Sequence, residues 1–265
     1  MVLVDGKQAT QIDAHDRGLH YGDGVFRTLK VENGMPCWWA DQYRKLAADC
    51  EALNLACPEE ALLLNEVRQA AREPDTGGVK IILTRGLGKR GYALPEQCQP
   101  VRLVMGFAYA AAARRDIRLR WCELRLSFQP RLAGIKHLNR LENVLARSEW
   151  NNPAIDEGLL LDETGNVIGG TMTNLFLFEQ GRLVTPELAR CGIAGVTRER
   201  LMRGASRNGM AVSIENIMPA RLLAADEVFL VNSLIRIWRA DSLDKHRWAD
   251  TGMLANLVNW LNEEN

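Results

Sequence analysis

The dipeptide Asn33-Gly34 separates two apolar runs, residues 25–31 and residues 35–39. Asn-Gly between two such runs is the strongest short signal for a β-hairpin, because both residues tolerate the left-handed backbone of a tight turn. A third apolar run, residues 2–4, precedes another turn signal. Residues 1–39 are therefore predicted to form strands joined by tight turns.

Helical and strand-like patterns both follow, which predicts a mixed α/β chain. Helices are predicted over residues 40–55, 59–73, 139–150 and 251–263, and another helix follows the glycine-led stretch at residues 191–198 and ends near residue 208. Strands are predicted over residues 79–83, 101–107, 116–126, 158–162, 167–168, 175–178 and 227–231. Turn residues between the strands after residue 158 predict an antiparallel meander.

The chain has 265 residues, enough for one large or two modest domains. The alanine-rich stretch at residues 108–114 has few groups that could anchor it. We expect a small N-terminal domain over residues 1–107, a connection over residues 108–114 and a larger domain over residues 115–265.

The composition excludes several classes of partner. A formal net charge of zero gives no electrostatic reason to expect binding to nucleic acid or an anionic membrane. The six cysteines have no paired short spacing, so we expect neither a zinc site nor any other metal site. Scattered thiols of this kind suit a protein in a reducing compartment. The N-terminus lacks an apolar signal core, and no apolar run reaches membrane-spanning length. These features together predict a cytoplasmic protein.

Lys136 has an unusual sequence environment. Small and apolar residues precede it, and Leu138, Leu141 and Leu145 follow at helical spacing, which predicts that the lysine stands where an amphipathic helix begins. Apolar surroundings favour the neutral amine of a lysine, and a neutral amine is a nucleophile toward carbonyl groups. A solvated lysine in front of a helix would explain the same pattern.

The segment GIKHLNRL, residues 134–141, resembles the lysine segment of fold-type IV pyridoxal-phosphate enzymes. It is most similar to the branch that converts 4-amino-4-deoxychorismate to 4-aminobenzoate and pyruvate in folate biosynthesis. The resemblance implies that Lys136 forms the aldimine with pyridoxal 5'-phosphate. It also implies a small α/β domain, a larger β-rich pseudo-barrel domain, and a homodimer acting on a small molecule at the domain junction.

Two further motifs carry the resemblance on the substrate side. The stretch DRGLHYGDGVFRT, residues 16–28, is similar to a family element in which the residue matching Thr28 is a catalytic hydroxyl, and we assign Tyr21 of this stretch to substrate binding. The stretch RGLGKRGY, residues 85–92, resembles a family segment near the substrate's carboxylate, which makes Arg90 and Tyr92 candidates there. Its Gly-x-Gly-x-x-Gly pattern opens no helix, so we reject a dinucleotide site.

The remaining motifs resemble the coenzyme-binding side of the family. The pair Arg44 and Lys45 occupies the place of a phosphate-binding arginine motif, with a lysine where the family has the arginine. The segment GVTR, which contains Val196 and Thr197, resembles the family's phosphate cup at a helix start. Asn174 and Ser233 lie in two other motifs of the coenzyme side.

Three positions depart from the family pattern: Gly169 stands where a glutamate pairs with the pyridine nitrogen, Lys45 replaces the arginine, and Arg236 stands in a loop that usually has small residues or proline. A ring without its carboxylate partner is a poorer electron sink. Transamination depends on that sink throughout, whereas forming an aromatic product helps to drive the lyase reaction. We therefore expect lyase activity with little transamination. A D-amino-acid or branched-chain transaminase and a homologue without catalysis are the alternatives.

Overall fold

The computed structural model describes residues 1–72, 76–110 and 116–263. The chain divides into two compact units, Met1–Ala111 with Ile135–Asn139, and Ala112–Gly134 with Arg140–Asn265. The expected connection over residues 108–114 lies partly outside the described residues. The segment Ile135–Asn139 belongs to the first unit by its contacts, although it follows the start of the larger domain in the sequence.

The described strands of the first unit form one antiparallel sheet in the order β2-β1-β6-β5-β3-β4. Their bounds are β1 Val2–Val4, β2 Lys7–Gln8, β3 Gly24–Glu32, β4 Met35–Pro36, β5 Thr76–Thr84 and β6 Val101–Ala108. The predicted Asn33-Gly34 hairpin is confirmed, since both residues have positive φ and Glu32 pairs with Met35. The predicted second strand is too long, because Trp38 adopts a left-handed backbone and a helix begins at Trp39.

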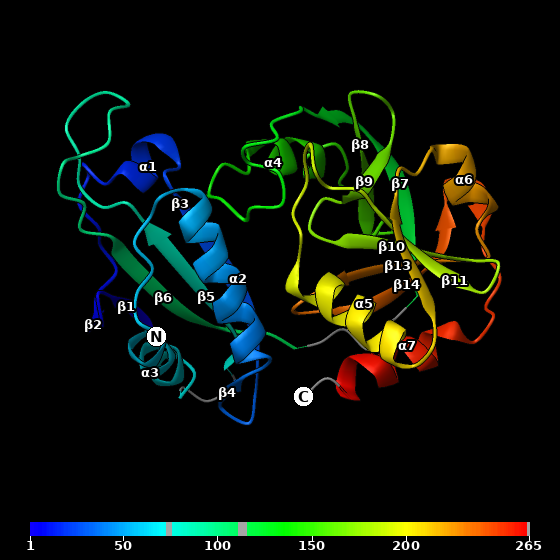
Figure 1. Cartoon of the computed structure of the whole chain (residues 1–265), viewed down its shortest axis with the longest axis horizontal. Coiled ribbons are helices and arrows are strands. Elements are labelled where there is room, and N and C mark those ends of the chain that lie inside the picture. Colours follow the sequence, from blue (N-terminus) through cyan, green and yellow to red (C-terminus); the bar gives the residue numbers. More distant parts are fainter. Residues whose placement is uncertain (73–75, 111–115, 264–265) are drawn as a thin grey trace. The chain divides into compact units, whose positions relative to one another are not determined.

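Helices α2 (Trp39–Ala52) and α3 (Glu60–Ala70) pack on this sheet (Figure 1). Alternate residues of β3, namely Val25, Leu29 and Val31, turn their side chains into the core with those of both helices. Burying each such side chain stabilises the unit by about 1.5–3 kcal/mol. The opposite face of β3 carries half-buried residues, so one strand serves both the core and a more accessible surface.

The second unit is a nine-stranded sheet in the part of the chain that the structure describes, in the order β12-β11-β10-β13-β14-β7-β8-β9 with β15 beside β14. The bounds are β7 Asp116–Leu126, β8 Glu157–Asp162, β9 Val167–Gly170, β10 Asn174–Glu179, β11 Arg182–Pro186, β12 Ala211–Glu215, β13 Glu227–Asn232, β14 Arg236–Leu243 and β15 His246–Arg247. Strands β8 and β9 pair as predicted, but β10 pairs with β11 and β13. The predicted continuous meander is therefore wrong.

Four helices are described in this unit: α4 (Leu141–Arg147), α5 (Val196–Arg207), α6 (Pro219–Ala224) and α7 (Met253–Glu263). Helices α5 and α7 lie side by side next to the sheet (Figure 1), and Leu257 and Leu261 of α7 are buried. Among the described residues, no helix has the length and apolar character needed to cross a membrane.

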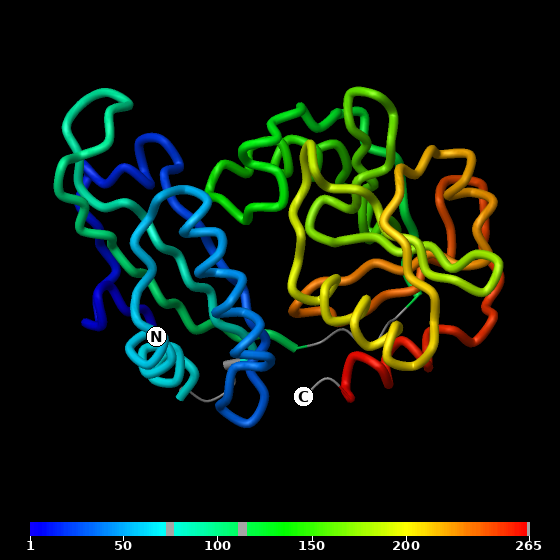
Figure 2. Tube along the Cα trace, in the orientation of Figure 1, coloured from blue at the N-terminus to red at the C-terminus, as the bar shows by residue number. Residues whose placement is uncertain are grey.

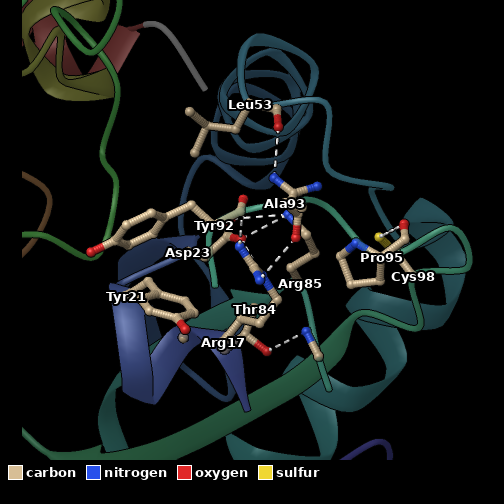
Figure 3. A network of polar contacts seen from close by, with 12 residues as sticks. Arg17, Tyr21, Asp23, Leu53, Thr84, Arg85, Tyr92, Ala93, Pro95 and Cys98 are labelled. Carbon is tan, nitrogen blue, oxygen red and sulfur yellow. Dashed lines mark hydrogen bonds and ion pairs between the residues drawn. The ribbon is translucent and has the colours of Figure 1, made fainter. Parts of the chain in front are cut away.

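A buried charge network anchors the loop between β5 and β6 in the first unit (Figure 3). Asp23 accepts hydrogen bonds from Arg17 at 2.9 Å and from Arg85 at 2.9 and 3.0 Å. Both arginines are almost fully buried. Burial alone would raise the pKa of the Asp23 carboxyl, but the hydrogen bonds and charges of Arg85 and Arg17 outweigh it and lower that pKa.

Arg17 extends this network to the loop. The short helix α1 (Arg17–Tyr21) begins with this arginine, whose guanidinium donates to the carbonyls of Gly91 at 3.1 Å and Ala93 at 3.3 Å. Figure 2 traces the loop as it passes beside α1. The loop is therefore held by a charge that Asp23 keeps in place.

Replacing Asp23 with asparagine should destabilise the protein by about 3 kcal/mol at neutral pH, because two buried arginines then share no carboxylate. The folded-state pKa of Asp23 is depressed, so its contribution is present above the ordinary value of 3.8 and is lost as pH falls through the folded-state value. Urea unfolding at neutral and acidic pH measures both effects. The difference between wild type and variant should shrink in acid.

The matched control is Asp13→Asn, since Asp13 pairs with His15 on an exposed surface. Water screens an exposed pair of this kind, so D13N should lower the stability far less than D23N does. Equal losses in the two variants would contradict the assigned role of the Asp23 network.

Candidate active site

Lys136 lies in an extended segment beside β3. The N–H of Phe26 donates to the Lys136 carbonyl at 3.0 Å, and the N–H of Leu138 donates to the Gly24 carbonyl at 3.0 Å. These bonds pair the segment with the start of β3. The lysine is thus placed by a sheet edge, not by a helix.

The predicted helix around this lysine is corrected on two points. Helix α4 begins only at Leu141, because the residues before it pair with β3 in an extended conformation. The predicted buried leucine face is wrong as well, since Leu141 is 68% exposed and Leu145 is 51% exposed. The buried residue of α4 is Ala146, which packs in an apolar cluster of the second unit.

The Lys136 side chain reaches the more accessible face of β3. Its Nζ lies 4.5 Å from the ring centre of Phe26. Thr28 is two residues further along the strand, so its side chain shares this face with Phe26. The structure therefore places the predicted lysine and the predicted hydroxyl on the same side of one strand.

Lys45 and Arg44, the predicted phosphate ligands of α2, each pair with a carboxylate one turn away or less. Arg44 donates to Asp41 at 2.5 Å and is mostly exposed. Lys45 forms an ion pair with Asp49, whose other carboxylate oxygen pairs with the buried Arg27. Burial lowers the pKa of the Arg27 guanidinium to about 9.

The three predicted substrate residues lie together on α1 and the anchored loop. The N–H of Gly91 donates to the Tyr21 hydroxyl at 3.1 Å, and the rings of Tyr21 and Tyr92 meet edge to face with centres 5.4 Å apart. Tyr92 is 86% exposed and Arg90 is exposed beside it. Residues 86–100 form a loop, as expected once a dinucleotide site is rejected.

In the second unit, the predicted phosphate-binding residues lie in the first turn of α5. Gly195 caps the helix without a side chain, so the first N–H groups of the helix have no side-chain acceptor from the cap. The Thr197 hydroxyl is buried and has no hydrogen-bond partner among the described residues. Free helix N–H groups and an unpaired hydroxyl suit a phosphate.

Asn174, predicted to bind the coenzyme, supports the loop in front of α5. Its side-chain amide donates to the Ile193 carbonyl at 2.7 Å, and its oxygen accepts from the Gly195 N–H at 3.1 Å. A Cβ atom at Gly195 would collide with this oxygen. The glycine and the asparagine therefore fit each other, and both fix where α5 begins.

Ser233 lies in the tight turn between β13 and β14. The Asn232 side-chain oxygen accepts from the N–H groups of Leu234 and Ile235 at 2.9 Å, and its amide donates to the Met172 carbonyl at 3.3 Å. Arg236 closes the turn with a positive φ. The turn is thus tied to residues 171–173, although Arg236 is an unusual residue for that conformation.

Gly169 lies at an irregularity in the pairing of β8 with β9. A Cβ atom at this position would lie 2.7 Å from the Thr173 carbonyl oxygen, which accepts a hydrogen bond from the Gly170 N–H. The turn is therefore shaped around a residue without a side chain. Where the family pattern has a glutamate, this chain therefore has a glycine and a backbone that leaves no room for a side chain.

A buried carboxylate lies under this same turn. Glu157 accepts from the hydroxyls of Thr171 at 2.6 Å and Thr173 at 3.2 Å, and from the N–H groups of Thr171 and Met172. Burial raises the pKa of the Glu157 carboxyl, and the hydrogen bonds from Thr171, Gly158 and Met172 oppose that shift. Glu157 holds the turn that Gly169 begins.

Three structurally important carboxylates, Asp23, Asp49 and Glu157, were not predicted from the sequence. Asp49 follows Lys45 by four residues on a helix, a spacing that signals an ion pair. Glu157 is the first residue of the buried strand β8, where a charged residue is unusual. Asp23 lies inside a motif that was interpreted only through Tyr21 and Thr28.

Comparison with known proteins agrees with the resemblance. The family model for amino-transferase class IV matches residues 24–243. An aminodeoxychorismate lyase of Vibrio harveyi is 34% identical over 241 residues, with 89% of each chain covered. The crystal structure of 4-amino-4-deoxychorismate lyase from Pseudomonas aeruginosa is 40% identical with a TM-score of 0.94, covering 99% of this chain and 98% of that one.

A branched-chain amino acid aminotransferase of Escherichia coli shares the fold, with a TM-score of 0.82 at 20% identity over 94% of this chain and 88% of that one. The predicted fold-type IV architecture is confirmed. On the family match and the similarity to the Vibrio harveyi lyase, the chain belongs to the class IV amino-transferase family.

Proposed function

We propose that this protein is a pyridoxal-phosphate-dependent lyase that converts 4-amino-4-deoxychorismate to 4-aminobenzoate and pyruvate, a step of folate biosynthesis. The observation that carries the proposal is the placement of Lys136, whose backbone is held on β3 and whose Nζ lies over Phe26 on the face that bears Thr28. The 40% identity with a solved 4-amino-4-deoxychorismate lyase supports the choice of substrate.

The residues present fit pyridoxal phosphate. The unpaired Thr197 hydroxyl and the N–H groups of the first turn of α5 would hold its phosphate, with Val196 at the start of that turn. Asn174 and Ser233 would shape the loops beside the coenzyme, and Lys45 would add a cation, as a point charge without the two-pronged contact of an arginine. When bound, the coenzyme supplies an aldehyde that reacts with amines and a ring that accepts electrons.

Two side chains would move protons. Lys136 Nζ takes the proton from the ring carbon that bears the substrate's amino group, acting as general base. Loss of this proton and of the enolpyruvyl group makes the substrate ring aromatic. The Thr28 hydroxyl donates or relays a proton to the departing enolpyruvyl fragment, which leaves as pyruvate. Arg90, Tyr92 and Tyr21 would bind the substrate, with Arg90 near its carboxylate.

Two broader features belong to the same proposal. We propose two domains, residues 1–107 and 115–265, joined over residues 108–114, and a homodimer that acts in the cytoplasm. The six free cysteines in the described part of the chain suit a reducing compartment.

Replacing Lys136 with alanine should abolish pyruvate release and the visible absorbance of the coenzyme, because the variant has no side-chain amine to react with it. Borohydride reduction followed by peptide mass spectrometry should find the coenzyme attached to Lys136 in the wild type. Pyruvate release that survives the substitution would refute the assignment. A wild-type protein that stays colourless with added pyridoxal phosphate would favour a homologue without catalysis.

Replacing Thr197 with valine should weaken coenzyme binding about tenfold to a hundredfold, the range expected when a hydrogen bond to a charged group is lost. Fluorescence titration with pyridoxal phosphate measures the change. The matched control is Ser206→Ala, at the opposite end of α5 and exposed. If wild type and T197V bound pyridoxal phosphate with equal affinity, the assignment of Thr197 to the phosphate site would be wrong.

The turn at Gly169 should keep transamination slow. Purified protein is expected to release pyruvate from 4-amino-4-deoxychorismate, and to transfer amino groups from D-alanine or branched-chain amino acids to 2-oxo acids far more slowly. Gly169→Ala should lower stability by about 1–3 kcal/mol, because its Cβ meets the Thr173 carbonyl. Rapid amino transfer with no 4-aminobenzoate formed would instead identify a transaminase.

A further inference from the structure

Asp49 is a buried carboxylate that contacts three groups from three parts of the first unit. It pairs with Arg27 of β3 and with Lys45 one helical turn earlier on α2. Its Oδ2 also accepts a hydrogen bond from the backbone N–H of Lys136 at 3.2 Å. The Asp49 side chain is 2% exposed, so these contacts are made away from bulk water.

The charges around Asp49 keep it ionised. An isolated carboxylate at this depth would be costly, but Arg27 and Lys45 supply two positive charges against its one negative charge. A charged acceptor binds an N–H group more strongly than a neutral one. The Lys136 N–H therefore meets a stronger acceptor than a backbone carbonyl.

Lys136 is consequently fixed on both sides of its Cα atom. Its carbonyl accepts from Phe26 on β3, and its N–H donates to Asp49 on α2. Two bonds to two separate elements leave the peptide groups on either side of the Cα atom little freedom to rotate. The direction of the Cα–Cβ bond is then set, and with it the starting point of the side chain that reaches over the Phe26 ring.

We infer that Asp49 is a positioning residue for Lys136, with Arg27 as the counter-ion that keeps its carboxylate charged in the core. The inference rests on the proposed function for the role of Lys136 in catalysis. The claim about the backbone of Lys136 stands on the contacts alone. Asp49 touches no reacting atom, and its effect on the reaction passes through the placement of Lys136.

The test measures amide hydrogen exchange at Lys136 in the full-length protein, with and without pyridoxal phosphate. Asp49→Ala removes the acceptor, and Asp49→Asn keeps a neutral one. Exchange at Lys136 should be slowest in wild type, intermediate in D49N and fastest in D49A. With the coenzyme bound, kcat should fall about tenfold to a hundredfold in D49A, the scale expected for misplacing a catalytic group, while KM changes little.

Two further variants separate positioning from general stability. Glu66 is a buried carboxylate of α3 that pairs with Arg102 at 3.0 Å, so Glu66→Gln should destabilise the same unit without changing kcat or exchange at Lys136. The double variant R27M/D49L removes cation and anion together, which should restore stability relative to D49A. It still lacks the acceptor, so exchange at Lys136 should stay fast and kcat should stay low.

Unchanged exchange at Lys136 in D49A would overturn the inference, and so would a wild-type kcat in the double variant. The exchange measurement does not depend on the reaction. If K136A still released pyruvate, the proposed function would be wrong, but exchange at Lys136 could still show that Asp49 protects this amide. Failure of the proposed function and failure of this inference are therefore distinguishable.

Discussion

The hydrogen bond between the Lys136 backbone and β3 fixes where this lysine lies in the first unit. The segment around Lys136 returns from the second unit's part of the sequence and adds itself to the edge of a sheet built from the first 108 residues. Because β3 alternates between a buried face and an accessible one, the same strand anchors the core through Val25 and Leu29. It turns Phe26, which contacts Lys136, to the other face together with Thr28. The position of Lys136 and the packing of the core therefore both depend on the pleat of one strand.

In the second unit, the phosphate site that we propose at the start of α5 contains no charged side chain. Asn174 holds the loop ahead of α5, Gly195 caps the helix without a side chain, and the buried Thr197 hydroxyl of the first turn has no hydrogen-bond partner among the described residues. An oriented helix end offers partial positive charge in a fixed place. An anion site of this kind depends on the backbone geometry of the helix start and does not need a particular basic residue.

Local patterns in the sequence were sufficient for much of this structure. The Asn33-Gly34 turn, α5 and α7 followed from turn chemistry, a glycine-led helix start and apolar spacing, because those signals act over a few residues. The environment of Lys136 did not follow, since the leucines after it share helical spacing but lie exposed, and the preceding segment pairs with a strand more than a hundred residues away. The buried carboxylates of Asp49 and Glu157 were missed for the same reason: their partners come together only in the fold.

The glycine at position 169 affects the paths by which this sequence can change. Any side chain there meets the carbonyl of Thr173, which is tied through Gly170 and Glu157 into a buried set of hydrogen bonds. A glutamate at this position would require the backbone of the turn to change at the same time. Homologues that keep this turn should therefore also keep glycine at position 169, even where selection would favour a glutamate there.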